Sequence, residues 1–311
     1  MIGDHLARRG IASAASDLEV RPLTGGVSND VFAVTGPGLN VVVKRALGQL
    51  RVAETWLADP ARIDTEGRAL RLADRITPGS VPRVIDFADG YLVIERAPET
   101  WHTWKDELLA GTVRLSVARA LGHALRRWQL AGAAAAQDFA DRTAFTQLRV
   151  DPFHRVIRER HPDLAAPVDE TLSIMADSSA CLVHGDYTPK NVMVDPAGDG
   201  MWVIDWEVAH LGDPTFDPAW TIGHLLLKSL HRPATAQQYA AAALAFLDAL
   251  AMPLDEAQLV RQTGCLVLAR VDGKSPADYL DDYAADRARE LGRRLLLDPP
   301  AVVTDAWKDL S

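Results

Sequence analysis

The stretch from Cys181 to Asp217, CLVHGDYTPKNVMVDPAGDGMWVIDWEVAHLGDPTFD, decides how this chain folds. Two short apolar runs within it, 192–194 and 201–204, are rich in β-forming residues, and a segment containing proline and glycine separates them. This pattern predicts an antiparallel hairpin. Asn191 precedes the first strand and Asp205 follows the second, so we expect both side chains at the same end of the hairpin.

Three oxygen-bearing side chains are expected at this end: Asp186, Asn191 and Asp205. Phosphoryl transfer requires a carboxylate that accepts the proton of the attacking hydroxyl, and oxygen ligands that hold Mg²⁺ on the phosphates. Asp186 and Asn191 keep the D-x-x-x-x-N spacing of the protein-kinase catalytic loop, and Asp205 stands where those enzymes carry the aspartate of D-F-G. The pattern therefore predicts Asp186 as the catalytic base and Asn191 and Asp205 as magnesium ligands.

The motif H-G-D-x-x-x-x-N at 184–191, followed by I-D-x-E at 204–207, resembles that of the aminoglycoside phosphotransferase and choline kinase superfamily. Its D-x-E form is most similar to methylthioribose kinase. The resemblance implies a bilobal, protein-kinase-like α+β fold. It also implies that Glu207 is a magnesium ligand, either directly or through water, and that Asp217 braces the catalytic-loop backbone. A simple helix N-cap is the alternative role for Asp217.

Residues 1–97 are expected to form the N-terminal nucleotide-binding lobe, a small antiparallel sheet with one main helix. Gly25, Gly26 and Ser28 lie between β-forming runs, which predicts a hairpin whose tip approaches phosphates through backbone N–H groups. Lys44 ends an apolar run in the way that the lysine of V-A-I-K does in kinases. A lysine in that position reaches the α- and β-phosphates of ATP.

A helix beginning at Pro60 or Thr65 places Glu66 on the same face as the apolar residues of the helix. Glu66 is therefore the expected ion-pair partner of Lys44. The lobe ends after an apolar strand at 90–94. The resemblance implies that the carbonyl of Glu95 and the N–H of Ala97 then hydrogen-bond adenine at a hinge.

Residues 98–311 are expected to form a large, mostly helical lobe for catalysis and acceptor binding. The segment 138–175 holds several polar residues, Arg149 among them, that are candidates for acceptor contacts. A charged turn at 270–276 has two interpretations. It closes one wall of the acceptor site, or it connects two helices and is stabilised by an Arg–Asp pair.

Composition limits the function further. The net charge of −9 argues against nucleic acid, because phosphate backbones require clustered Lys and Arg. It is compatible with a cationic substrate, although an acidic balance mainly serves solubility. No apolar run approaches the ~20 residues that span a bilayer, no signal peptide is evident, and two cysteines provide no disulfide framework. We expect a cytoplasmic monomer or homodimer without a membrane partner.

These features predict an ATP-dependent kinase, with Mg²⁺, that transfers the γ-phosphoryl group to a hydroxyl of a small molecule such as a sugar, an amino alcohol or an antibiotic. A catalytically silent nucleotide-binding module is the alternative. Such pseudokinases usually lack a base, a lysine or a metal ligand, and this chain has all three. A metal phosphohydrolase is a third interpretation, but it requires paired metals bridged by carboxylate and histidine clusters. The sequence does not specify the acceptor.

Overall fold

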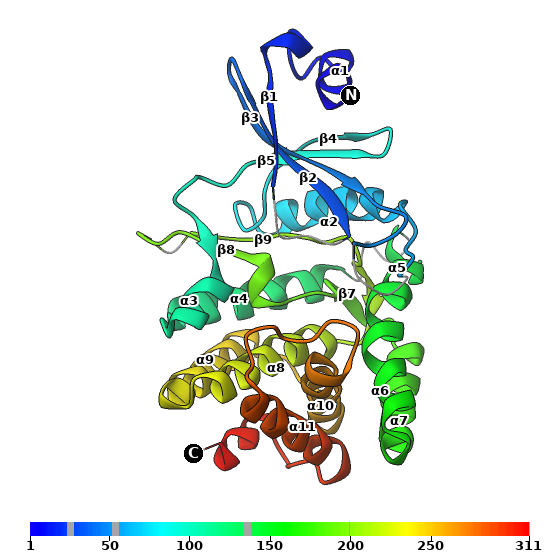
Figure 1. Ribbon diagram of the computed structural model, residues 1–311, viewed down its shortest axis with the longest axis vertical. Coiled ribbons are helices and arrows are strands. Elements are labelled where there is room, and N and C mark those ends of the chain that lie inside the picture. Colours follow the sequence, from blue (N-terminus) through cyan, green and yellow to red (C-terminus); the bar gives the residue numbers. More distant parts are fainter. Residues whose placement is uncertain (24–27, 52–55, 133–137, 199, 311) are drawn as a thin grey trace.

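The computed structural model describes residues 1–23, 28–51, 56–132, 138–198 and 200–310. Gly25 and Gly26, at the predicted phosphate-binding turn, lie outside these ranges. The chain forms a smaller lobe built on an antiparallel sheet and a larger lobe that is mostly helical (Figure 1). This arrangement confirms the predicted α+β, kinase-like fold class.

The N-terminal sheet has five antiparallel strands in the order β1-β2-β3-β5-β4. Helix α2 covers one face of the sheet, and α1 packs against the other. The bounds are α1 Ile2–Arg8, β1 Glu19–Pro22, β2 Asn29–Gly36, β3 Leu39–Ala46, α2 Arg62–Ile76, β4 Val84–Ala88 and β5 Tyr91–Glu95, with a 3-10 turn, η1, at Ala15–Asp17.

Alternation along β3 decides which of its side chains face helix α2. Val41 and Val43 pack in the apolar cluster on the α1 side, whereas Val42 packs on the other face against the core that includes α2. Successive strand residues point to opposite faces of a sheet, so Lys44 shares the face of Val42. Glu66 is buried on the side of α2 that faces this strand.

The C-terminal lobe consists of helices packed side by side, with α4 on α9, α8 on α10 and α10 on α11. Its helices are α3 Trp104–Ala110, α4 Leu115–Gly132, α5 Thr143–Phe145, α6 Val156–Arg160, α7 Ala165–Asp177, α8 Phe216–His231, α9 Ala236–Leu250, α10 Glu256–Asp272 and α11 Asp282–Leu297. A π-helical segment, η3, spans Thr146–Arg155, and 3-10 turns lie at η4 Pro162–Leu164, η5 Pro189–Asn191, η6 Pro233–Thr235 and η7 Val303–Asp309.

The predicted hairpin lies between the two lobes (Figure 1). Strand β8 (Val192–Val194) pairs antiparallel with β9 (Met201–Val203), and β6 (His102–Thr103) adds a third strand. Just before the hairpin, β7 (Cys181–Val183) pairs with β10 (His210–Gly212). These two small sheets hold the catalytic loop at both of its ends.

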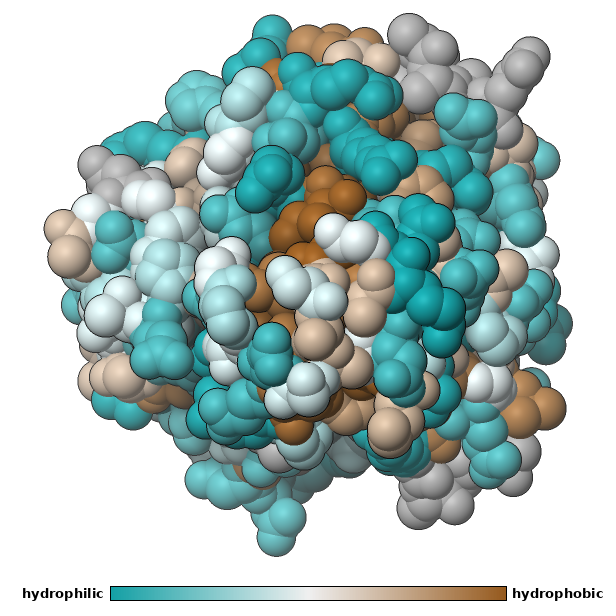
Figure 2. All heavy atoms as spheres, turned by 90° about the horizontal axis from the view of Figure 1, so that it is seen from above, coloured by the Kyte–Doolittle hydropathy of each residue, from teal (hydrophilic) through white to brown (hydrophobic). Residues whose placement is uncertain are grey.

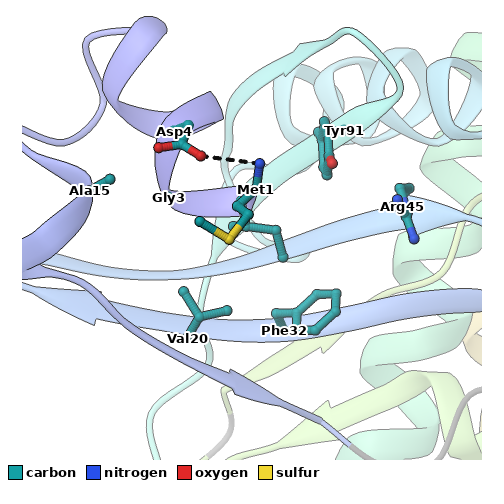
Figure 3. A pocket seen from close by; sticks show the side chains of 9 residues that line it. Met1, Gly3, Asp4, Ala15, Val20, Phe32, Arg45 and Tyr91 are labelled. Carbon is teal, nitrogen blue, oxygen red and sulfur yellow. Dashed lines mark ion pairs between the residues drawn. The ribbon is translucent and has the colours of Figure 1, made fainter.

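The outer end of the N-terminal lobe carries a surface pocket of about 400 Å³. Val20, Phe32 and Tyr91 line it, and the amino group of Met1 pairs with Asp4 at its rim (Figure 3). Viewed from this end, the molecule shows apolar side chains surrounded by hydrophilic ones (Figure 2). None of the predicted site residues lines the pocket, so we place the chemistry elsewhere.

Within the described ranges, no helix is both long enough and apolar enough to cross a bilayer.

Candidate active site

The hairpin brings Asn191 and Asp205 together, as the sequence predicts. The N–H of Ile204 donates to the carbonyl of Asn191 at 2.9 Å, and Asp205 follows directly. Asp205 has a φ of 70°, a left-handed conformation that aspartate adopts more readily than most residues. Strained backbone of this kind is concentrated at functional sites, so the outlier supports a role for this carboxylate.

A glycine immediately before Asp186 allows the catalytic loop to turn. Gly185 has a φ of 82°, and a Cβ on it would lie 2.9 Å from the carbonyl oxygen of Val208. Any other residue would be strained and would displace this backbone. The glycine of H-G-D is therefore required by packing as well as by conformation.

Asp217 braces the catalytic loop. Its two carboxylate oxygens accept the backbone N–H groups of His184 at 2.7 Å and Gly185 at 2.9 Å. The N-cap of α8 is Thr215, so Asp217 lies inside the first turn of that helix. The simple N-cap role is therefore wrong, and the bracing role that the resemblance implies is confirmed.

His184 holds the loop as a neutral imidazole. Burial lowers its pKa to about 4. Its Nδ1 accepts the N–H of Asp186 at 3.1 Å, so Nε2 carries the proton and donates to the carbonyl of Ile204 at 3.1 Å. The imidazole thus joins the catalytic loop to the end of the hairpin.

One carboxylate oxygen of Asp186 is heavily occupied. Its Oδ2 lies 2.8 Å from Nη2 of Arg149 and 3.0 Å from Nζ of Lys190. The side-chain amide of Asn191 donates to the same oxygen at 2.8 Å. Among the described residues, none donates a hydrogen bond to Oδ1. That oxygen is therefore the one available to an acceptor hydroxyl.

The two cations keep Asp186 ionised. Burial alone would raise the pKa of Asp186, but the positive charges of Arg149 and Lys190 outweigh it and lower the pKa below its ordinary value. Arg149 was one of several candidates in the sequence, and it alone among them reaches Asp186. Lys190 lies inside the catalytic loop, where no sequence motif distinguishes it from a solvated lysine.

Lys44 forms the ion pair that the sequence predicts and a second one. Its Nζ lies 2.6 Å from Oε1 of Glu66 and 2.9 Å from Oδ1 of Asp205. Burial alone would lower the pKa of Lys44, but the charges of Asp205 and Glu66 outweigh it and raise the pKa. The lysine is therefore a permanent cation that joins the N-terminal sheet to the exit of the hairpin.

Glu207 is buried in a network that also includes Arg62. Its Oε2 accepts from Nε of Arg62 at 3.0 Å and from Nδ2 of Asn29 at 2.8 Å. Arg62 also donates to the carbonyl of Ser28. The network ties the D-x-E acid to α2 and to the described end of the glycine-rich turn. Sequence reasoning missed Arg62 and Asn29, because each occupies an ordinary position at the start of an element.

The two predicted adenine-binding residues lie where the chain leaves the sheet. Glu95 is the last residue of β5, and Ala97 lies two residues beyond, in the connection to β6. Within the described chain, neither residue forms a hydrogen bond with the residues around Asp186. Their role toward adenine stays a prediction.

The acids near the hairpin fit a magnesium ion that is held mainly by phosphates. No group of three or more His, Cys, Asp or Glu side chains in the described chain could hold a metal by itself. Mg²⁺ on a nucleotide, however, usually takes one or two carboxylates and completes its shell with phosphates and water. Asp205 is partly exposed, and the amide nitrogen of Asn191 is engaged with Asp186, which leaves its carbonyl oxygen as a ligand.

Comparison with known proteins agrees with this geometry. Residues 19–254 match the phosphotransferase enzyme family. Among curated proteins, none matches the sequence.

The fold is shared over nearly the whole chain with many solved structures, among them the following three. A macrolide 2′-phosphotransferase from Brachybacterium faecium covers 96% of this chain and 98% of its own, with a TM-score of 0.55 and 18% identity. An aminoglycoside phosphotransferase in a ternary complex with ADP and hygromycin B covers 95% and 97%, with a TM-score of 0.55 and 16% identity. A choline kinase from Cryptosporidium parvum covers 94% of each, with a TM-score of 0.57 and 10% identity. The fold and the family match agree, and this protein belongs to the phosphotransferase enzyme family.

Proposed function

We propose that this protein is an ATP-dependent kinase that phosphorylates a hydroxyl group of a small molecule. The observation that carries the proposal is the asymmetric environment of Asp186, whose Oδ2 is held by three donors while Oδ1 is left for an acceptor. The aminoglycoside phosphotransferase relative was solved with ADP, which supports ATP as the phosphoryl donor.

The nucleotide side of the site lies toward the N-terminal lobe. Lys44, fixed by Glu66 and Asp205, positions the α- and β-phosphates. Backbone N–H groups from Gly25 to Ser28 would cover the phosphates, and the backbone at Glu95 and Ala97 would bind adenine.

The metal ligands follow from the same geometry. Asp205 and Asn191 would hold magnesium. Glu207, fixed by its hydrogen bond from Arg62, would help to position these ligands. When bound, magnesium neutralises charge on the transferring phosphoryl group.

Asp186 acts on the acceptor side. Its Oδ1 accepts the proton of the acceptor hydroxyl. The acceptor oxygen forms a bond to the γ-phosphorus, and the bond between that phosphorus and the β,γ-bridging oxygen breaks, which releases ADP. The lowered pKa makes Asp186 a weak base. A weak base suffices, because the loose transition state of phosphoryl transfer needs orientation more than early proton removal.

An ADP-release assay with hydroxyl compounds tests the proposal, with Asp186→Asn as the matched variant. We expect the variant to bind an ATP analogue as the wild type does and to lose roughly 10²–10⁴-fold in kcat, the range for a general base. Retention of wild-type turnover would remove Asp186 from the mechanism. ATP binding without turnover of any compound would favour a silent nucleotide-binding module, and ATP loss without a phosphorylated acceptor would favour a phosphohydrolase.

A further inference from the structure

Lys228 is a buried lysine with no negative partner among the residues that the structure describes. It lies one turn after His224 in α8, and its side chain is 1% exposed. Its ammonium donates only a long hydrogen bond of 3.5 Å to the carbonyl of His224 in the same helix. In the part of the chain that the structure describes, no carboxylate forms an ion pair with it. A buried charge in this situation is strongly unfavourable unless something else compensates it.

The groups around Lys228 add positive charge. Its ammonium lies 5.3 Å from the ring centroid of Tyr279, and the ammonium of Lys105 lies 6.0 Å from the same centroid. Burial, followed by the charges of Arg270 and Lys105, lowers the pKa of Lys228 to about 7. The fold therefore gathers cations at a buried place without supplying the acid that would balance them.

Arg270 and Tyr279 each present a buried polar atom with no hydrogen-bond partner. Nη1 of Arg270 donates to the carbonyl and to Oγ of Ser275, the latter at 2.8 Å, but its Nε is unpartnered. The hydroxyl of Tyr279 is also buried and unpartnered among the described residues. Buried donors without acceptors are rare in folded proteins, so each group retains an unused donor that a bound acceptor atom could satisfy.

The Arg–Asp pair expected within the turn 270–276 is wrong, and among the described residues no carboxylate forms an ion pair with Arg270. Asp272 pairs with Arg289 at 2.9 Å and with His161 at 2.9 Å, both outside the turn. The exposed Asp278 acts on Arg270 only through its charge and forms no ion pair with it. The turn does connect two helices, α10 and α11, and its other interpretation, that it closes a wall of the acceptor site, stays a prediction.

The cluster lies within the electrostatic reach of Asp186. Burial lowers the pKa of both Arg270 and His224, and the negative charge of Asp186 opposes this in both. These groups therefore share one electrostatic environment with the catalytic carboxylate. Helices α8 and α10 belong to the helical lobe, whereas Lys44 lies in the sheet of the opposite lobe (Figure 1). The cluster is thus separate from the residues that serve the nucleotide phosphates.

We propose that Lys228, Arg270 and Tyr279 bind an anionic group of the acceptor, a carboxylate or a phosphate, so that the substrate is an acidic hydroxyl compound. This inference rests on the proposed kinase function. Ammonium and guanidinium groups bind both anions through charge-assisted hydrogen bonds, and the phenol supplies one more donor. A cationic acceptor, which the net charge of −9 is compatible with, would meet a positively charged wall. The local charges decide the specificity, not their sum over the chain.

Anion binding can be measured without turnover. A non-hydrolysable ATP analogue and magnesium fill the nucleotide side, and inorganic phosphate or malonate is titrated against wild type, Lys228→Met and the control Lys308→Met, whose lysine is 71% exposed. We expect at least one anion to raise the melting temperature of the wild type and the control. Its dissociation constant should rise roughly ten- to hundredfold in Lys228→Met, the effect of losing a hydrogen bond to a charged group.

The unliganded variant provides a second readout. Lys228→Met should melt at or above the wild-type temperature, because methionine removes a buried charge while keeping most of the volume. Equal anion binding by wild type and Lys228→Met, or no binding by the wild type, would overturn the proposal. Arg270→Met provides an independent variant, and it should weaken the same anion by a similar factor.

Turnover separates this inference from the kinase function. Hydroxy acids, sugar phosphates, neutral sugars and amino alcohols including choline are compared as acceptors, so that carboxylate and phosphate are tested apart. We expect phosphorylation in one of the two acidic classes, with a raised KM in Lys228→Met. Turnover confined to neutral or cationic acceptors contradicts the anionic site and leaves the kinase intact. Anion binding through Lys228 without turnover of any acceptor contradicts the kinase and leaves the anion site intact.

Discussion

Lys44 and Lys228 are both buried lysines, and the fold treats them in opposite ways. Lys44 has carboxylate oxygens of Glu66 and Asp205 within 3 Å, and its pKa is raised. Lys228 has neighbouring cations instead, and its pKa is lowered. The protein itself balances the charge of Lys44, which holds that lysine in place. The charge of Lys228 is not balanced by the residues that the structure describes, and in our proposal a bound anion balances it. In our proposal, Lys44 is therefore held by the protein alone, whereas the acceptor side is completed by an anionic substrate.

The largest expected difference between the two sides is in stability. Lys44→Met leaves the fully buried Glu66 without its partner, which should lower the free energy of unfolding by about 3–5 kcal/mol. Lys228→Met should leave it unchanged or raise it. Urea unfolding of both variants measures the contrast. Equal losses in the two variants would mean that Lys228 is a structural cation and that the comparison is wrong.

The Lys44–Glu66 pair can be tested by a double-mutant cycle. Lys44→Met and Glu66→Gln should each reduce kcat/KM for ATP, and the double variant should lose less than the sum of the two effects, because residues in contact share one interaction. Steady-state kinetics of the three variants checks this. If the losses in kcat/KM were additive, Glu66 would act independently of Lys44.

Magnesium dependence should distinguish the two acids of the D-x-E motif. Asp205→Asn should lose activity at every magnesium concentration. Glu207→Gln disturbs the network with Arg62 and Asn29, and it should raise the magnesium concentration for half-maximal rate roughly ten- to hundredfold, as outer partners of metal ligands do. A magnesium titration of both variants measures this. Equal losses that metal does not rescue would make Glu207 a ligand of the same rank as Asp205.

A smaller effect is expected from pH. Lys228 has a pKa of about 7 in the fold and about 10.4 when unfolded. Its buried charge is therefore least favourable below pH 7, and between these values the unfolded chain binds the extra proton, so stability rises with pH. Lys228→Met should raise the melting temperature more at pH 6 than at pH 9. The groups near Lys228 that contribute to this background are Lys105, His224, His231, Arg270 and Tyr279. The charge of Asp278 acts on two of these groups, Arg270 and Tyr279.

The same titration should appear in the kinetics. The value of kcat/KM for an acidic acceptor should fall as pH rises through about 7, because that parameter reports the free enzyme. Because the pKa of Asp186 is lowered, protonation of this carboxylate should not reduce kcat/KM between about pH 5 and 7. A flat profile on the alkaline side, or one that is the same in Lys228→Met, would contradict the assignment of the cation.

Local patterns in the sequence were sufficient to predict two relations in the site, the pairing of Lys44 with Glu66 and the position of Asp205 beside Asn191. The alternation along β3 and the periodicity of α2 place Lys44 opposite Glu66, and the hairpin places Asp205 beside Asn191. Each of these relations depends on one strand, one helix or one turn. The approach of Lys44 to Asp205 depends on how the lobes pack, and it could not be derived from either segment.

The acceptor side could not be predicted in the same way. Lys228 lies in an otherwise apolar stretch of α8, and Arg270 lies 42 positions later in α10, so only the packing of the two helices brings them together. A lysine among buried leucines was the one available signal, because lysine is almost never fully buried unless it is paired. The turn 270–276 suggested an Arg–Asp pair because the two residues are only two positions apart, but the tertiary fold gives Asp272 other partners.

The most direct test of the account is the mass of an acidic hydroxyl compound after incubation with ATP, magnesium and the protein. Wild type should add one phosphoryl group to a hydroxy acid or a sugar phosphate, Asp186→Asn should add none within the same time, and Lys228→Met should do so only at much higher acceptor concentration. A product formed equally by wild type and Asp186→Asn, or formed only from cationic alcohols, would contradict the account.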